Sequence, residues 1–155
     1  IHGGLLGGVL AGYIYTKVKK LNFFKMADCV VLGIPLAQAI GRWGNYLNKE
    51  AHGGPTDLPW GIMVDGIKVH PTFLYESIWD LAIFIFLMLF RKKQKYEGQI
   101  LVYYITLYSI GRFFIEGLRT DSLMLGPLRM AQVISLGFIL IGVILNYVLS
   151  KKNKR

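Results

Sequence analysis

Residues 29–54 read CVVLGIPLAQAIGRWGNYLNKEAHGG, and this stretch decides the fold class. Its first half, 29–40, is an apolar run of the kind that lies in a lipid bilayer. Polar side chains then follow in close succession, at Arg42, Asn45, Asn48 and Glu50. Glycines between and after them allow a ligand or another backbone segment to come close. An arginine with amides and a carboxylate at the end of a membrane helix predicts a phosphate-binding site.

The composition of the whole chain also indicates a membrane protein. Of its 155 residues 54% are hydrophobic, and the formal net charge is +9. The single cysteine, Cys29, excludes a disulfide framework and is expected in the core. The first residue is Ile1 rather than Met, so we expect a fragment or a processed chain with at least one span upstream. No signal peptide is visible.

The apolar segments predict an all-α fold, a polytopic membrane helix bundle with about five transmembrane helices. The predicted segments are 3–16, 26–46, 73–90, 99–118 and 130–149. Pro35 is expected to kink the second segment. Glycines spaced four apart in 3–16 allow close helix contacts in lipid. A polar loop over about 47–69, with a hairpin around 64–67, and a turn through Gly126 and Pro127 connect the later segments.

The basic residues predict how the helices are oriented. Three clusters, at 17–25, 91–95 and 151–155, hold four Lys or Arg each, twelve of the 18 in the chain. The positive-inside rule places these clusters in the cytoplasm. Five spans then alternate without adjustment, so that the loop 47–69 and residues 120–129 lie outside.

Polar residues of the fourth segment share one helix face that is expected at the outer level of the membrane. They are Tyr108, Arg112, Glu116 and Arg119, spaced by four, four and three. Residues expected at the same level or above it are His2, Arg42, Asn45, Glu50, His70, Tyr75 and Glu76. Charged groups at this depth commonly face a cavity and mark function.

Structural interpretations of the same residues stay open. Arg42 can be an interfacial anchor, Arg112 and Glu116 an ion pair between helices, and His2 a packing residue. His52 and His70, in or beside the loop, are more often structural. Asp28 and Asp80 lie near span ends and are expected to be structural.

The sequence offers no cofactor signature. The three histidines have no metal-ligand spacing, so no metal site is expected. No phosphate-binding Walker loop, dinucleotide fingerprint or G-x-S-x-G motif occurs. No cofactor and no nucleic acid are expected as partners, since topology and anionic headgroups account for the basic clusters.

Four motifs together resemble the prolipoprotein diacylglyceryl transferase family. They are HGGLLGG at 2–8, GRWGNYLNKEAHG at 41–53, HPTFLYE at 70–76 and GRFFIEGLRTD at 111–121. The order agrees with the family, and Tyr46 stands where Phe is common. The family has seven spans, so the resemblance implies that this chain is the C-terminal part, a single membrane-embedded transferase domain lacking about the first two spans.

The resemblance implies transfer of the diacylglyceryl group of phosphatidylglycerol to the thiol of a preprolipoprotein lipobox cysteine, giving a thioether and glycerol phosphate. The expected catalytic residues are His2, Arg42 and Arg112, with His2 as the candidate base. The expected substrate-binding residues are Asn45, Glu50, Gly53, Tyr75, Tyr108, Glu116 and Arg119. The arginines suit a leaving phosphate, and Glu50 and Glu116 are expected to orient them or to bind glycerol hydroxyls.

The expected location is the bacterial plasma (inner) membrane, crossed several times, with the active site toward the outer face. Partners are phosphatidylglycerol, the lipobox segment and membrane lipids. The alternative is a non-enzymatic transporter or channel that binds an anionic solute in an outer-leaflet pocket. Charge confined to one side speaks against it, because a permeation route needs polar groups through the inner half as well.

Overall fold

The computed structural model describes residues 2–120, 124–125 and 127–152, and within them the fold is largely helical. The long helices are α1 (His2–Val18), α2 (Phe23–Val31), α3 (Ile34–Leu47), α4 (Thr72–Phe90), α5 (Gln99–Glu116) and α6 (Met130–Lys152). The short elements are the 3-10 turn η1 (Arg91–Lys93) and the strands β1 (Ile62–Val64), β2 (Ile67–Val69), β3 (Met124–Leu125) and β4 (Leu128–Arg129). Every predicted apolar segment is helical in the structure.

The break expected in the second segment is confirmed. It separates α2 from α3, which are bent by 41° relative to each other. Pro35 lies in the first turn of α3, where its missing N–H costs no helical hydrogen bond. The segment is therefore two helices joined by a corner, and α3 carries the start of the polar motif.

The expected hairpin is also present. Val64 pairs with Ile67 across the two-residue turn Asp65-Gly66, in which both residues have positive φ, 49° and 83°. Positive φ at both positions is what a type I′ hairpin turn requires. A second, shorter hairpin of β3 and β4 precedes α6, and sequence reasoning expected only a turn there. Gly126 of that turn lies outside the described residues.

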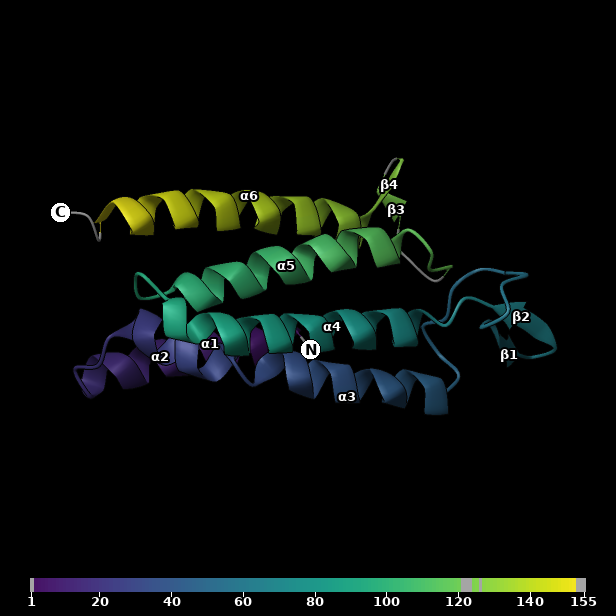
Figure 1. Cartoon of the computed structure of the whole chain (residues 1–155), viewed down its shortest axis with the longest axis horizontal. Coiled ribbons are helices and arrows are strands. Elements are labelled where there is room, and N and C mark those ends of the chain that lie inside the picture. The colour runs from purple at the N-terminus through teal and green to yellow at the C-terminus, as the bar shows by residue number, and fades with distance from the viewer. Residues whose placement is uncertain (1, 121–123, 126, 153–155) are drawn as a thin grey trace.

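The helices α3, α4, α5 and α6 lie side by side in chain order and alternate in direction (Figure 1). Both hairpins lie at one end of this row, and the end of α4, the start of α5 and the end of α6 lie at the other. The basic cluster at 91–95 and the described part of the cluster at 151–155, Lys151 and Lys152, therefore share the end away from the hairpins. This common end is what the charge-based orientation predicts.

The helix α1 has few neighbours in the described structure. It contacts α2, and a Cβ added at Gly3, Gly4, Gly7, Gly8 or Gly12 would meet no atom within 4 Å. The glycine spacing that favours close helix contact thus has no partner helix among the described residues. Cys29 of α2 is exposed, so its expected place in the core is wrong.

Within the described part of the chain, two helices are long and apolar enough to cross a membrane, Thr72–Lys93 and Met130–Lys151. The bent pair of α2 and α3 gives a third candidate if the two form one span. The helix α1 has only 17 residues, and α5 carries Arg112 and Glu116 in its last turns. The structure thus agrees with an all-α membrane protein and does not confirm the count of about five spans.

A core and a buried carboxylate join α2, α4 and α5 near the end away from the hairpins. Val31, Ile83, Leu87 and Ile100 form the core. Asp28, 4% exposed, accepts hydrogen bonds from the backbone N–H groups of Gly98 and Leu101 at 2.6 and 2.9 Å. The side chain of Gln94 also donates to Asp28. Asp28 thus caps the first turn of α5, where the helix dipole favours a negative charge.

We predict that Asp28→Ala destabilises the bundle, because it leaves the two buried N–H groups without their acceptor. Hydrogen bonds to charged groups contribute about 1.5–3 kcal/mol each, so the loss of two should lower the free energy of unfolding by roughly 3–6 kcal/mol. Thermal unfolding in detergent measures this. Cys29→Ala, at the exposed neighbouring position, is the matched control and should change little; equal midpoints for the two variants would contradict the capping role.

Candidate functional site

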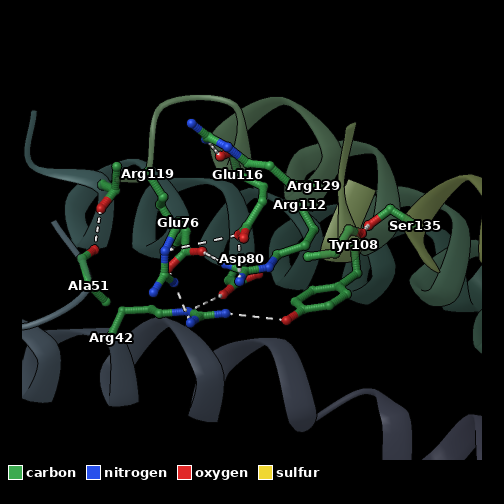
Figure 2. A network of polar contacts seen from close by, with 12 residues as sticks. Arg42, Ala51, Glu76, Asp80, Tyr108, Arg112, Glu116, Arg119, Arg129 and Ser135 are labelled. Carbon is green, nitrogen blue, oxygen red and sulfur yellow. Dashed lines mark hydrogen bonds and ion pairs between the residues drawn. The ribbon is translucent and has the colours of Figure 1, made fainter. Parts of the chain in front are cut away.

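A network of ion pairs joins α3, α4 and α5 toward the hairpin end of the bundle (Figure 2). Arg42 of α3 places Nη1 3.1 Å from Oε2 of Glu76 in α4. The other oxygen of the Glu76 carboxylate accepts a hydrogen bond from Arg112 of α5. A single carboxylate therefore lies between two guanidinium groups that are far apart in sequence.

Further pairs extend this network along α4 and α5. Arg42 Nε lies 3.8 Å from Oδ2 of Asp80, one turn after Glu76. Arg112 Nη2 lies 2.7 Å from Oε2 of Glu116, one turn further along α5. Arg119 Nε lies 4.0 Å from the same Glu116 oxygen. Spacings of four residues place Glu76 and Asp80 on one face of α4, and Arg112 and Glu116 on one face of α5, as predicted. Arg119 was predicted on the same helix face, but α5 ends at Glu116 and Arg119 lies beyond its end.

The acids of the network are far more buried than the arginines. The side chains of Glu76, Asp80 and Glu116 are 4%, 3% and 5% exposed, against 19% for Arg42 and 21% for Arg112. Buried carboxylates at such sites need paired cations, because an isolated charge is costly to desolvate. The guanidinium groups lie on the more open side of the network.

Arg129, at the end of β4, completes the network. Its Nη1 donates to the backbone carbonyl of Glu116, at the C-terminal end of α5. A cation there also compensates the negative end of the helix dipole. Among the described residues the network joins four arginines to three carboxylates, so with all of these groups ionised they carry one net positive charge.

A small pocket lies between the arginines. Its lining residues are Arg42, Glu76, Trp79, Asp80, Tyr108, Gly111, Arg112 and Ile115. Its volume is about 10 Å³, room for roughly one water. An anion larger than water must therefore draw the guanidinium groups apart. We call this the arginine pocket.

Two contacts shape the walls of the arginine pocket. The Tyr108 hydroxyl accepts a hydrogen bond from Arg42 Nη2 at 3.2 Å. The Trp79 indole donates to the Leu107 carbonyl at 3.0 Å and lies directly over Gly111, where a Cβ would clash with it. The glycine before Arg112 is thus explained by helix packing between α4 and α5.

A second, larger cavity of about 260 Å³ lies between the end of α3, the hairpin of β1 and β2, and the start of α4. Its lining residues are Asn45, Tyr46, Leu47, Lys49, Glu50, His52, Ile62, Met63, Val64 and Phe73. None of them lines the arginine pocket. We call this the outer cavity. The motif 41–53 is therefore divided, with Arg42 in one pocket and Asn45 and Glu50 in the other.

Of the remaining expected site residues, Glu50 and Tyr75 lie apart from the arginines, whereas Gly53 pairs with Arg119 in an isolated antiparallel bridge. Glu50 accepts from Asn48 at 3.2 Å and pairs with no arginine among the described residues. The Tyr75 hydroxyl accepts from Trp60 at 2.9 Å and lies 3.3 Å from His70 Nδ1, on the loop side. Gly53 is buried where a Cβ would clash with His70, so close chain packing explains this glycine. His2 begins α1, and its side chain lies outside the described part of the chain.

Sequence reasoning missed two members of the network. Asp80 was expected to be structural, yet it pairs with Arg42; its position four residues after Glu76 was the available signal. Arg129 entered only the charge count, and its contact with α5 depends on the β3–β4 hairpin, which the sequence did not predict. Glu76 was expected at the same membrane level, either as a functional group or as a residue that caps or pairs locally; it is the residue that connects the two arginines.

Comparison with known sequences identifies the family. A sequence model described as prolipoprotein diacylglyceryl transferase matches residues 1–148. A phosphatidylglycerol–prolipoprotein diacylglyceryl transferase of Clostridioides difficile (strain 630) is 78% identical over 154 residues, 99% of this chain and 62% of that protein. Proteins of the same name from Clostridium novyi (strain NT) and Finegoldia magna are 53% and 54% identical and are covered to 64% and 59%.

The chain thus spans about three-fifths of the length of these relatives. Because the family model and these relatives match nearly all of its residues, the chain belongs to the prolipoprotein diacylglyceryl transferase family.

Proposed function

We propose that the protein transfers the diacylglyceryl group of phosphatidylglycerol to the lipobox cysteine of preprolipoproteins. The observation that carries this proposal is the arginine network, whose described residues carry one net positive charge beside a pocket at the hairpin end of apolar helices. A phosphodiester brings one negative charge, which would neutralise the network. The substrates named for the relatives supply that group.

The guanidinium groups retain donors for a phosphate. Arg42 directs one contact from each nitrogen, to Glu76, Asp80 and Tyr108. A guanidinium has five N–H groups, so two remain for an incoming oxygen. Because Arg42 and Arg112 share the Glu76 carboxylate, a phosphate that separates them would take over part of that pairing.

The proposed reaction is a substitution at carbon. The thiolate sulfur attacks the carbon of the diacylglyceryl group that is esterified to the phosphate. The S–C bond forms as the bond between this carbon and the phosphate oxygen breaks. Glycerol phosphate leaves with the bonding electrons, and the thiol proton passes to a base. Arg42 and Arg112 stabilise the charge that grows on the phosphate, the role of a preorganised electrostatic site. His2 is the proposed base.

Of the other proposed binding residues, Tyr108 lines the arginine pocket, and Asn45 and Glu50 line the outer cavity. We assign the phosphate end of the substrate to Tyr108, Glu116 and Arg119. The substrate groups near the loop 47–69 are assigned to Asn45, Glu50, Gly53 and Tyr75. The chain acts as a single membrane-embedded domain, in a bacterial plasma membrane that it crosses several times, with the arginine pocket toward the outer face. The alternative, a path for an anionic solute, is disfavoured by the apolar core of Val31, Ile83, Leu87 and Ile100 beyond the network.

The direct test is transfer of labelled diacylglyceryl from phosphatidylglycerol to a lipobox peptide by the full-length protein in membranes. A thioether product sensitive to removal of the peptide cysteine supports the proposal. Uptake of an anionic solute by proteoliposomes without any transfer would favour the alternative.

The topology predicts that 47–69 and 120–129 lie outside and that 17–25, 91–97 and the tail lie inside. Single-cysteine variants on a Cys29→Ala background, labelled in intact cells with an impermeant maleimide, measure this. Removal of Cys29 is needed because that thiol is exposed on the protein. External labelling within 91–97 would overturn the orientation.

Arg42→Lys should fail to restore activity although it keeps the charge. A planar guanidinium contacts Glu76, Asp80 and Tyr108 at once and still offers donors to phosphate, which a single ammonium does not. Loss of a charge-assisted contact costs about 1.5–3 kcal/mol, or roughly 10- to 150-fold in rate. Turnover near that of the wild type would make Arg42 an anchor rather than a phosphate ligand.

His2→Gln should lower the rate by about 10²–10⁴ if His2 removes the thiol proton. Raising the pH should then partly restore the rate, because a free thiol ionises with a pKa of about 8.5. If Arg112 instead promotes thiolate formation, Arg112→Gln should be the severe and pH-sensitive variant. Rate-against-pH curves for both variants separate the two mechanisms, and an unchanged His2→Gln rate at neutral pH removes His2 from the chemistry.

A further inference from the structure

The outer cavity lies one helical turn from the arginine pocket on both helices that the two share. On α3, Arg42 lines the arginine pocket and Asn45 the outer cavity. On α4, Glu76 lines the arginine pocket and Phe73 lines the outer cavity. Three residues of helix rise about 4.5 Å. A group bound in the outer cavity is therefore within reach of a phosphate bound between the arginines.

The contact between α3 and α4 is held by specific interactions next to the two pockets. The Trp43 indole donates to Ser77 Oγ at 3.2 Å, and Ser77 Oγ donates to the Ala39 carbonyl at 2.8 Å. The rings of Tyr46 and Phe73 stack with centroids 4.9 Å apart and form one wall of the outer cavity. These contacts hold the distance between the two pockets.

The outer cavity has a mixed lining. Tyr46, Phe73 and Val64 supply apolar surface, and Asn45 and Lys49 supply polar groups. Its volume of about 260 Å³ is the space of roughly nine waters at ~30 Å³ each. Such a lining fits small side chains of a polypeptide, whose backbone also needs hydrogen-bond partners.

The strand β1 offers those partners at the cavity. Val64 and Ile67 flank the two-residue turn and form a hydrogen-bonded pair, so the next pair, Met63 with Lys68, is non-hydrogen-bonded. The Met63 N–H and carbonyl therefore point away from β2. On β2 the corresponding Lys68 carbonyl accepts from the Thr56 N–H at 2.9 Å, but Met63 has no such partner among the described residues.

We propose that the outer cavity and the open edge of β1 bind the extended acceptor peptide around its cysteine. The peptide would pair with the Met63 N–H and carbonyl as an added strand, a common mode of peptide recognition. Its thiol would then point along α3 and α4 into the arginine pocket. This inference rests on the proposed transfer reaction and assigns the two substrates to separate pockets.

A lipid occupant is disfavoured by the same observations. Acyl chains need no backbone donor and acceptor, and the outer cavity carries Asn45, Lys49, Glu50 and His52 on its walls. The arginine pocket, in contrast, has the cationic groups that a phosphodiester needs. The polar lining of the outer cavity therefore favours the peptide there, and the cationic groups of the arginine pocket favour the lipid phosphate.

The test compares Met63→Pro with Met63→Ala in the full-length protein. Proline removes the outward N–H without removing a ladder hydrogen bond, a position where strands tolerate it, whereas alanine keeps the N–H. We expect Met63→Pro to raise the KM for a lipobox peptide about 3- to 10-fold over Met63→Ala and to leave the KM for phosphatidylglycerol unchanged. Ile67→Ala, an exposed site on the same hairpin outside the cavity lining, is the control.

The outcomes separate this inference from the proposed function. Absence of transfer by the wild-type protein refutes the function. An active wild type whose Met63→Pro variant keeps the peptide KM of Met63→Ala, or shows a changed KM for phosphatidylglycerol instead, refutes the peptide site.

Photocrosslinking gives a readout that does not depend on how Met63→Pro folds. A lipobox peptide with a photoreactive residue next to its cysteine should crosslink to 45–52 or 62–64 of the wild-type protein. Crosslinks confined to α1 or α6 would overturn the proposal.

Discussion

The sharing of Glu76 by Arg42 and Arg112 is the interaction on which the rest of the site depends. Each oxygen of one buried carboxylate holds a different guanidinium, and these come from α3 and α5 on either side of α4. Removing one partner of a buried ion pair commonly costs about 3–5 kcal/mol, because the other charge is left unpaired. Glu76 thus fixes both the order of three helices and the spacing of two cations.

The same network explains why the arginines are ready to bind an anion without being free charges. Asp80 and Tyr108 hold Arg42, and Glu116 holds Arg112, so neither side chain needs to become ordered when a phosphate arrives. Preorganised cations in a poorly solvated place are effective at stabilising growing negative charge. The pocket is small in this structure, so the anion must replace some of the contacts with Glu76.

The sequence predicted the helices well because their signals are local. Apolar runs, Pro35 and the Asp65-Gly66 turn each act on their own neighbourhood, and the face of Tyr108, Arg112 and Glu116 follows from helical spacing. Ion pairs and hydrogen bonds between elements are harder to predict from sequence spacing. Asp80 and Arg129 were not assigned to the site, because their partners lie on other elements. The separation of Asn45 from Arg42 likewise depends on where the hairpin packs, which spacing alone does not give.

Binding of phosphatidylglycerol by the purified full-length protein tests the central claim most directly. Native mass spectrometry can compare phosphatidylglycerol with the zwitterionic phosphatidylcholine for the wild type and for the Arg42→Gln, Arg112→Gln double variant. The account predicts selective retention of phosphatidylglycerol by the wild type and loss of that selectivity in the variant, with the helical content preserved. Equal selectivity in both proteins would contradict the assignment of the phosphate to this arginine pair.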